Sequence, residues 1–395
     1  MVCAGITKTA TRITIQYNAS DGTKGASFSN PYTLGDIYDT AVEGGWTGDF
    51  NKEGAVYTTK CEIYILGITT YVHFYAATLQ WIASGTYLID LSSSYFDVGS
   101  DGTVEKEGCT FINRCGVIKN YRLYGRARIY DTSFTGDRLP SGNGTIYPSA
   151  YGGAAYPFIL ERCTFINMTY TPSFNLSGAS YANVIHRDCF ILNAAYAIQL
   201  YGTQFSELSG LRAIGKIFTL LGSSSMTVIG RNWNCPRGTA DFRVYSSTGS
   251  TVLLRMIDCI TGAIQPRSNY ALSVIGDKGI AQWESTFNFN ITNGENAAIK
   301  MYNVENTLVI DTALDASGKL TGEEIIYRIY SQEKIGDSQW ETINKYTHPF
   351  KVVIEKEGYQ KLEIDNITVT SGVPTIIRGM LKGSPLQLKS LKLSK

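Results

Sequence analysis

The sequence predicts an all-β protein whose main part is a parallel β-solenoid, in which each coil packs on the coils before and after it. The motif Cys-Thr-Phe-Ile-Asn at residues 109–113 returns at residues 163–167. Looser copies surround Phe134 and Phe190, so that successive motif phenylalanines lie 23, 31 and 25 residues apart. A period of roughly 20–50 residues is typical of stacked supersecondary units. Each copy of the motif is therefore expected to be one strand of a coil.

Residues 1–55 are predicted to form a lead-in with a capping helix. Thr33 and Asp36 have the spacing of a capping box at a helix start. Four residues would share one face of this helix: Leu34, Ile37, Tyr38 and Ala41. The pair Gly44-Gly45 would end it. Such a helix would cover the open end of the solenoid, where an uncovered edge invites unwanted pairing.

Residues 56–302 are predicted to form the solenoid. Three short strands plus turns give a coil of about 22–25 residues, with equivalent inward residues stacked about 4.8 Å apart. An internal aromatic stack is expected from the motif phenylalanines: Phe111, Phe134, Phe165 and Phe190. Residues 63–89 contain no Asp, Glu, Lys or Arg. Their many β-branched and aromatic residues favour buried strands over a membrane helix, so no membrane span is expected.

One step of the repeat is longer than the others and holds an excursion at residues 137–145. Insertions in repeat proteins map to loops on one face, which is often the binding face. This part of the sequence therefore holds the candidate binding residues: Asn143, Tyr147, Tyr151 and Tyr156. Tyrosine suits protein interfaces and can also stack on the rings of glycans.

In its repeat length and its Cys-Thr-Phe-Ile-Asn coil motif, this stretch resembles the right-handed parallel β-helix superfamily, which has the pectin-lyase-like fold. The resemblance covers about 240 residues. Members of that superfamily include polysaccharide lyases and hydrolases, phage tailspikes and other virion proteins. The resemblance therefore implies a right-handed parallel β-helix, and it does not select one of these activities.

Residues 303–384 have more charges and strands of alternating pattern. Phe350, Val352 and Ile354 alternate with Lys351, Val353 and Glu355, as expected of strands that bury one face in an antiparallel sandwich. The run from Leu308 to Leu381 resembles a carboxypeptidase-regulatory-like or similar immunoglobulin-like module, which implies a non-catalytic spacer or adhesive appendage. The matching segments are Val309-Ile310-Asp311, Ala316-Ser317-Gly318, the run from His348 to Tyr359, and Ile367-Thr368-Val369. The expected fold is thus a right-handed parallel β-helix followed by a small immunoglobulin-like β-sandwich.

Residues 385–395 are predicted to be a basic, leucine-rich tail. After Asp365 the sequence has no acid and five bases. One interpretation is a solvated chain end. The other is a strand that pairs with a sheet edge of a neighbouring subunit. The second interpretation assigns assembly to four residues: Leu386, Leu388, Leu391 and Leu393.

The eight cysteines include no CxxC pair, which argues against a zinc site, and no metal or cofactor is expected. The cysteines are interpreted as reduced, buried thiols stacked coil on coil. Disulfides in an exported particle are the alternative, with Cys109 and Cys115 as the pair to test. The net charge of +1 gives no field that would attract nucleic acid. The N-terminus lacks the pattern of a secretory signal.

No standard catalytic motif is present. His186-Arg187-Asp188 places a base, a cation and an acid together, yet neighbours along a strand alternate faces. A β-helix glycosidase would need two carboxyls about 5–9.5 Å apart, which stacked coils would supply. The weak catalytic candidates are Asp131 with Asp188 and Glu161 with Asp137. Acids on outer faces are ordinarily solvated, so catalysis is not the favoured interpretation.

Together these features favour a structural protein of a phage or archaeal-virus particle: a spike, fibre or decoration protein without enzyme activity. It would be made in the host cytoplasm and would assemble as a homotrimer with other virion proteins. Host cell-surface polysaccharide is a further partner to test. The first alternative is a tailspike-type depolymerase, either a hydrolase or a lyase. The second is an adhesin at the cell surface, which the missing signal sequence argues against.

Overall fold

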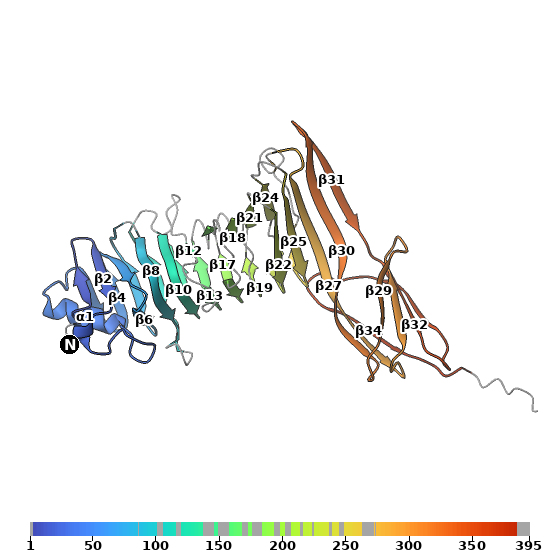
Figure 1. Ribbon diagram of the computed structural model, residues 1–395, viewed down its shortest axis with the longest axis horizontal. Helices are drawn as coiled ribbons and strands as arrows, with labels where there is room; N and C mark the ends of the chain where they lie inside the picture. Colours follow the sequence, from blue (N-terminus) through green and yellow to red (C-terminus); the bar gives the residue numbers. More distant parts are fainter. Residues whose placement is uncertain are drawn as a thin grey trace, which may run out of the picture. The chain divides into compact units, whose positions relative to one another are not determined.

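A computed structural model shows an all-β chain with long stacks of parallel strands (Figure 1). The residues that it describes are 3–85, 87–100, 106–115, 120–136, 146–148, 158–167, 173–175, 184–192, 198–201, 207–213, 216–222, 225–236, 239–244, 249–262, 272 and 274–384. These residues contain one α-helix and one short 3₁₀ helix.

The chain divides into two compact units. The first unit comprises Met1–Arg255, Ile260–Ala281 and Ser331–Thr342, and the second comprises Met256–Cys259, Gln282–Tyr330 and Ile343–Lys395. The main change from the first unit to the second thus falls at Ala281, and a later segment returns to the first unit.

The first unit is built from three sheets of mainly parallel strands. Sheet 1 contains β1 (Ile6–Lys8), β2 (Arg12–Gln16), β5 (Glu62–Leu66), β6 (Tyr71–Phe74), β8 (Tyr87–Val98), β10 (Asn120–Tyr130), β12 (Ile146–Pro148), β13 (Phe158–Glu161), β16 (Val184–Arg187), β19 (Glu207–Ser209), β22 (Met226–Arg231) and β25 (Thr251–Ile257). Sheet 2 contains β3 (Phe50–Glu53), β4 (Val56–Thr59), β7 (Thr78–Trp81), β9 (Thr110–Asn113), β11 (Ser133–Thr135), β14 (Thr164–Ile166), β17 (Phe190–Leu192), β20 (Arg212–Ala213), β23 (Asn234–Cys235) and β26 (Ile260–Thr261). Sheet 3 contains β15 (Ser173–Asn175), β18 (Ile198–Tyr201), β21 (Lys216–Gly222) and β24 (Thr239–Val244).

From β13 onward the chain visits the three sheets in the same order, once per coil. Equivalent strands lie next to one another in register, as when Phe134 of β11 pairs with Phe111 of β9 and Phe165 of β14. The stack starts earlier than residue 56, because Ile13 of β2 already pairs in parallel with Ile63 of β5. This arrangement is compatible with a parallel β-helix.

Each coil turns from sheet 1 to sheet 2 through a two-residue corner. The first corner residue has a left-handed backbone, with φ between +48° and +61° at these five positions: Asp131, Arg162, Asp188, Gly210 and Asn232. The second corner residue is buried in every case: Thr132, Cys163, Cys189, Leu211 and Trp233. Its carbonyl accepts a hydrogen bond from the next coil, as Thr132 does from the Thr164 N–H at 2.9 Å. The repeated Cys-Thr-Phe-Ile motif is therefore the second corner residue followed by a strand of sheet 2.

The core of sheet 2 contains the predicted aromatic stack, with one correction. The rings of Phe111 and Phe134 lie 5.4 Å apart, and those of Phe134 and Phe165 lie 5.1 Å apart and nearly parallel. Phe165, however, pairs with Ile191, and Phe190 pairs with Thr164. The prediction that Phe190 joins the stack was wrong, because the buried cysteines fix the register and Phe190 directly follows Cys189. Phe190 therefore lies on the opposite side of the strand, where it is partly exposed.

The predicted capping helix is present as α1 (Leu34–Glu43), and the capping box between Thr33 and Asp36 is complete. The helix buries Leu34, Ile37, Thr40 and Ala41, whereas Tyr38 is only partly buried. Gly44 is the C-cap residue. The Thr40 hydroxyl also accepts a hydrogen bond from the Cys3 N–H at 3.2 Å, which fastens the start of the chain to the helix.

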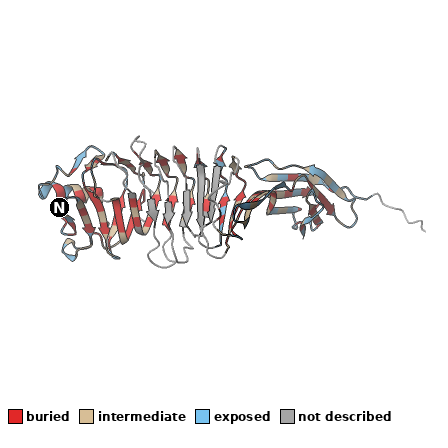
Figure 2. Cartoon of the chain, turned by 90° about the horizontal axis from the view of Figure 1, so that it is seen from above, coloured by how far each residue is buried: buried red, intermediate tan, exposed pale blue. Residues whose placement is uncertain are grey.

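The uncharged run at residues 63–89 forms parts of β5 and β8 and all of β6 and β7. Its inward residues are fully buried, among them Ile63, Phe74 and Trp81. In the described part of the chain, no helix has the length and apolar character that a membrane crossing requires. Figure 2 shows buried residues in red along successive strands of the first unit.

The second unit contains two groups of strands. One group contains the parts of β27 (Lys278–Thr292), β30 (Lys319–Gly336) and β31 (Gln339–Tyr346) that belong to this unit, with β34 (Thr375–Met380) beside β27 in parallel. The other is an antiparallel sheet in the order β29 (Leu308–Ala313), β28 (Ala298–Tyr302), β32 (Phe350–Glu355) and β33 (Leu362–Ile367). Phe287 of β27 meets Phe350 of β32, with ring centres 5.5 Å apart. As predicted, Phe350, Val352 and Ile354 are buried.

Candidate functional site

The candidate catalytic carboxylates lie around the corners between sheets 1 and 2, where they form ion pairs between coils. Arg162 Nε and Nη2 donate to the two oxygens of Asp131 at 2.7 and 2.9 Å. Arg162 Nη1 also donates to Glu161. Arg187 Nη1 donates to the other oxygen of Glu161 at 2.9 Å. Asp131 and Glu161 are thus held by arginines of the same and the following coil.

This arrangement differs from the one that a glycosidase needs. In that reaction one carboxyl protonates the leaving group while the other acts on the sugar carbon or on a water molecule. Both oxygens of Asp131 and both of Glu161 instead accept hydrogen bonds from guanidinium groups. Such pairs link one coil to the next and resemble the cross-strand pairs that stabilise sheets. Asp188 is an exposed corner residue, and Asp137 lies outside the described residues.

The side chains of His186, Arg187 and Asp188 lie in three different environments. His186 points into the core, where its register neighbours are Leu160 and Leu208. Burial lowers the pKa of its imidazole to about 4, so the ring is neutral at pH 7. Arg187 lies on the outer face, paired with Glu161. The alternation predicted from the strand is therefore present, and the three side chains do not form one site.

The outer face of sheet 1 carries a second set of matched charges. Asp90 and Asp97 of β8 are buried, yet each is paired in register with an arginine of β10. Arg128 Nε donates to Asp97 at 2.9 Å, and His73 Nε2 lies 3.6 Å from the same carboxylate. The Arg128 guanidinium also lies over the Phe28 ring, 4.9 Å from its centre. An aromatic cover of this kind shields the ion pair from water.

The outer face of sheet 2 carries no charge from β4 to β17. Its twelve outward residues are all partly exposed and form two in-register columns. The first column is Val56, Thr78, Thr110, Ser133, Thr164 and Phe190, and the second is Thr58, Gln80, Ile112, Thr135, Ile166 and Leu192. Charged residues return in the next coil with Arg212. The alternating pattern of each strand is visible in the sequence, but only the register between strands shows that the outward residues form one continuous uncharged face.

Each unit also has a shallow hollow. In the first unit, a hollow of about 280 Å³ lies between the start of α1, the β3–β4 turn and the end of β6, with Lys52, Tyr57 and Tyr75 among its lining residues. In the second unit, a hollow of about 370 Å³ lies at the turn from β32 to β33. It is lined by five residues: Glu355, Lys356, Glu357, Tyr359 and Lys361.

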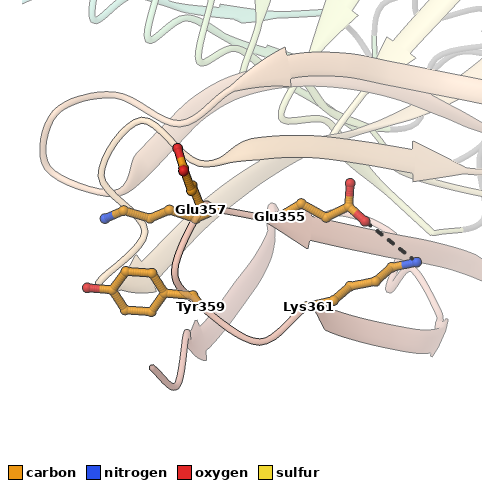
Figure 3. Close-up of a pocket in the computed structure, with 5 residues that line it drawn as sticks. Glu355, Glu357, Tyr359 and Lys361 are labelled. Carbon is orange, nitrogen blue, oxygen red and sulfur yellow. Dashed lines mark ion pairs between the residues drawn. The ribbon is translucent and has the colours of Figure 1, made fainter. Parts of the chain in front are cut away.

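Most charges of the second hollow are already matched. In Figure 3 the Glu355 carboxylate and the Lys361 ammonium group point toward one another, 3.7 Å apart. Lys361 is also 2.7 Å from Glu363. The two neighbouring lysines, Lys361 and Lys351, lower the pKa of Glu363 to about 2. Lys356 is held by Glu295 at 2.7 Å and lies over the Tyr359 ring. Of the acids and lysines that line the hollow, Glu357 alone has no ion pair among the described residues.

Several predicted residues are not described. Asn143, Tyr151, Tyr156 and the tail leucines Leu386, Leu388, Leu391 and Leu393 lie outside the described residues. Of Tyr147 only the backbone is described, and it pairs with Arg122. All eight cysteines, Cys109 and Cys115 included, are reduced thiols. Among the described residues no cluster of His, Cys, Asp or Glu could hold a metal ion.

Comparisons with known proteins gave no relatives. No family model matches the chain, and neither a curated protein nor a solved structure is similar to it. The candidate site is therefore defined by the residues of this chain alone.

Proposed function

We propose that this chain is a structural protein of a phage or archaeal-virus particle, a spike, fibre or decoration protein without enzyme activity. In this proposal the first unit is a right-handed parallel β-helix and the second is an immunoglobulin-like β-sandwich. The protein acts as a homotrimer, together with other virion proteins. It meets the host at cell-surface polysaccharide.

One observation carries the proposal: two of the four candidate catalytic carboxylates, Asp131 and Glu161, link coils to one another. Asp131 and Glu161 are both engaged by Arg162. A stack of this kind is a rigid scaffold, because every coil is joined to the next by backbone hydrogen bonds, buried side chains and ion pairs. Rigidity along the stack is what a particle appendage requires.

The proposal is tested by the mass of the full chain in solution, measured by light scattering. A homotrimer has three times the 43.4 kDa of the single chain. If the tail adds a strand to a neighbouring subunit, Leu386→Asp with Leu388→Asp should weaken the trimer. Lys389→Gln with Lys392→Gln is the matched control, because it changes the charge of the tail and keeps its leucines. As isolated chains, both variants should have the same melting temperature as the unsubstituted chain.

Three outcomes would count against the proposal. A full chain that stays monomeric at all concentrations would remove the homotrimer. An intact trimer in the leucine variant would remove the assembly role of the tail. Release of reducing ends or unsaturated sugars from host envelope would establish the depolymerase instead. The full chain is required for this test, because truncation at residue 302 would remove Ser331–Thr342, which belongs to the first unit.

A further inference from the structure

The second unit holds an arginine that lies over two aromatic rings. Arg328 is on β30, which has β27 on one side and β31 on the other. Its guanidinium carbon is 4.4 Å from the centre of the Trp283 ring and 5.1 Å from the centre of the Tyr346 ring. Because Trp283 is on β27 and Tyr346 on β31, the rings approach from the two neighbouring strands. Contacts of this kind fix the plane of the guanidinium.

The charge of Arg328 is not matched within the described part of the chain, where its side chain makes no ion pair and no hydrogen bond. Its Nε is fully enclosed and lacks an acceptor. Its two Nη atoms are not enclosed in this way, so the outer edge of the guanidinium is open. An enclosed donor without an acceptor is rare in native proteins and calls for a missing partner.

A second nitrogen without a partner lies close by. His348 Nδ1 is enclosed and has no hydrogen-bond partner among the described residues. The ring of His348 is 5.4 Å from that of Tyr346. Tyr346 itself is 52% exposed, although it contacts both of these groups. An open tyrosine ring thus has an unmatched guanidinium and an imidazole as neighbours.

Several other cations that lie over rings have acids beside them, although Lys52, which lies over Tyr38 and Tyr57, has no ion pair among the described residues. Arg122 lies over Tyr87 and is paired with Asp90. Lys356 lies over Tyr359 and is paired with Glu295. Unlike Arg122, Arg328 has no acid beside it within the described residues, and an anionic ligand would supply one.

We propose that Arg328, Tyr346 and His348 form a binding site for an acidic sugar, a pyranose that carries a carboxylate. The planar edge of Arg328 matches a carboxylate, which it can bind through two parallel hydrogen bonds. The exposed ring of Tyr346 provides a flat apolar surface for the sugar ring. His348 borders this surface, with its ring edge-on to that of Tyr346. The choice of a sugar rests on the proposed function, in which the protein meets host polysaccharide.

The test is a ligand-observed NMR titration of the full chain with glucuronate, glucose and glutamate as separate probes. Glucuronate should bind more tightly than either glucose, which lacks the carboxylate, or glutamate, which lacks the sugar ring. Arg328→Gln should weaken glucuronate binding roughly tenfold to a hundredfold, the range for a lost charge-assisted contact. Tyr346→Ala should weaken glucuronate and leave glutamate unchanged. Because Tyr346 is exposed, that variant should fold even if Arg328→Gln does not.

Lys345→Gln is the matched control. It removes a positive charge from the same strand, but Lys345 already has a carboxylate partner in Glu305 at 3.4 Å, so affinity should change less than about twofold. Equal affinity for glucuronate and glucose, or an unchanged affinity in Tyr346→Ala, would overturn the site. Preference for glutamate would instead identify an acidic protein segment as the ligand. A protein that binds no probe and yet forms the expected trimer would refute this site alone and leave the proposed function standing.

Discussion

The two outer faces of the first unit differ sharply, although both cover the same core. The outer face of sheet 1 carries buried acids matched by arginines, as in Asp90 with Arg122 and Asp97 with Arg128. The outer face of sheet 2 carries no charge over the six coil positions from β4 to β17. The inward residues of both sheets are alike, since they are buried and mostly apolar in each.

This difference separates what the fold requires from what the surface adds. An inward position must be apolar and must fit its neighbours in the adjacent coils. An outward position has only to tolerate water, and it can do so with matched charges or with β-branched residues that suit a pleated surface. Sheet 1 follows the first solution and sheet 2 the second. Substitutions on the two faces should therefore have different costs.

The largest effect is expected inside sheet 2. Phe134→Ala should destabilise the protein by roughly 4 kcal/mol, because Phe134 is buried between the rings of Phe111 and Phe165 and a cavity would remain. Phe190→Ala should cost about 1 kcal/mol at most, since that ring is outward. Chemical denaturation of both variants measures the difference. Equal losses would mean that the register assigned to Phe190 is incorrect.

The next effect concerns the charges of sheet 1. Arg128→Met should cost about 3 kcal/mol, because the Asp97 carboxylate is 1% exposed and would be left without its cation. Replacing both partners, with Asp97→Leu added, should recover most of this loss. Arg162→Met is the control. Its partner Asp131 is 40% exposed and so remains in reach of water, and its other partner Glu161 keeps Arg187 as a cation, so the loss should stay under about 1 kcal/mol. A double variant as unstable as the single one would show that the pair does not act as a unit.

The buried histidine of sheet 1 should make stability depend on pH. The pKa of His186 is about 4 in the fold, against 6.5 for an unperturbed histidine, so between these values the unfolded chain binds a proton that the folded chain excludes. Stability is therefore full above pH 6.5 and falls as the pH is lowered toward 4. Between pH 7 and pH 5 the loss due to His186 should be about 2 kcal/mol.

His186→Leu provides the comparison for this prediction, because leucine occupies the equivalent position in both adjacent coils. The two proteins should be denatured at pH 7 and at pH 5. The fall in stability should be smaller in the variant by the amount stated. A fall of the same size in both would assign the pH dependence to the carboxylates alone.

Much of the first unit could be predicted from the sequence because its pattern is local. The strand motif repeats within about 25 residues, and the capping box needs only Thr33 and Asp36. The prediction for Phe190 failed because the copies of the motif were aligned on their phenylalanines. In the structure it is Cys163 and Cys189 that occupy equivalent corners. A one-residue shift reverses the face of a side chain.

The site around Arg328 could not be predicted in the same way. Arg328 and Tyr346 come from consecutive strands, but Trp283 lies on β27, 45 residues before Arg328, and no sequence motif connects the three. The site is marked by a cation without a neighbouring acid. Whether a cation has an acid beside it depends on contacts that only the fold creates. The candidate carboxylates show the converse, because their partners Arg162 and Arg187 became evident only when the coils were stacked.

The smallest effect is expected on the outer face of sheet 2, and it is the strictest test of the comparison. Thr164→Lys places a charge in the middle of the uncharged columns, between Ser133 and Phe190. In the isolated chain its effect should stay within about 0.5 kcal/mol, because Thr164 is partly exposed and a lysine can reach water. The inward neighbour Phe165 would not tolerate the same change. A loss of several kcal/mol at residue 164 would mean that this face is covered in solution. The absence of charged residues on it would then be explained by a contact, and not by β-branched residues being as compatible with water as matched charges are.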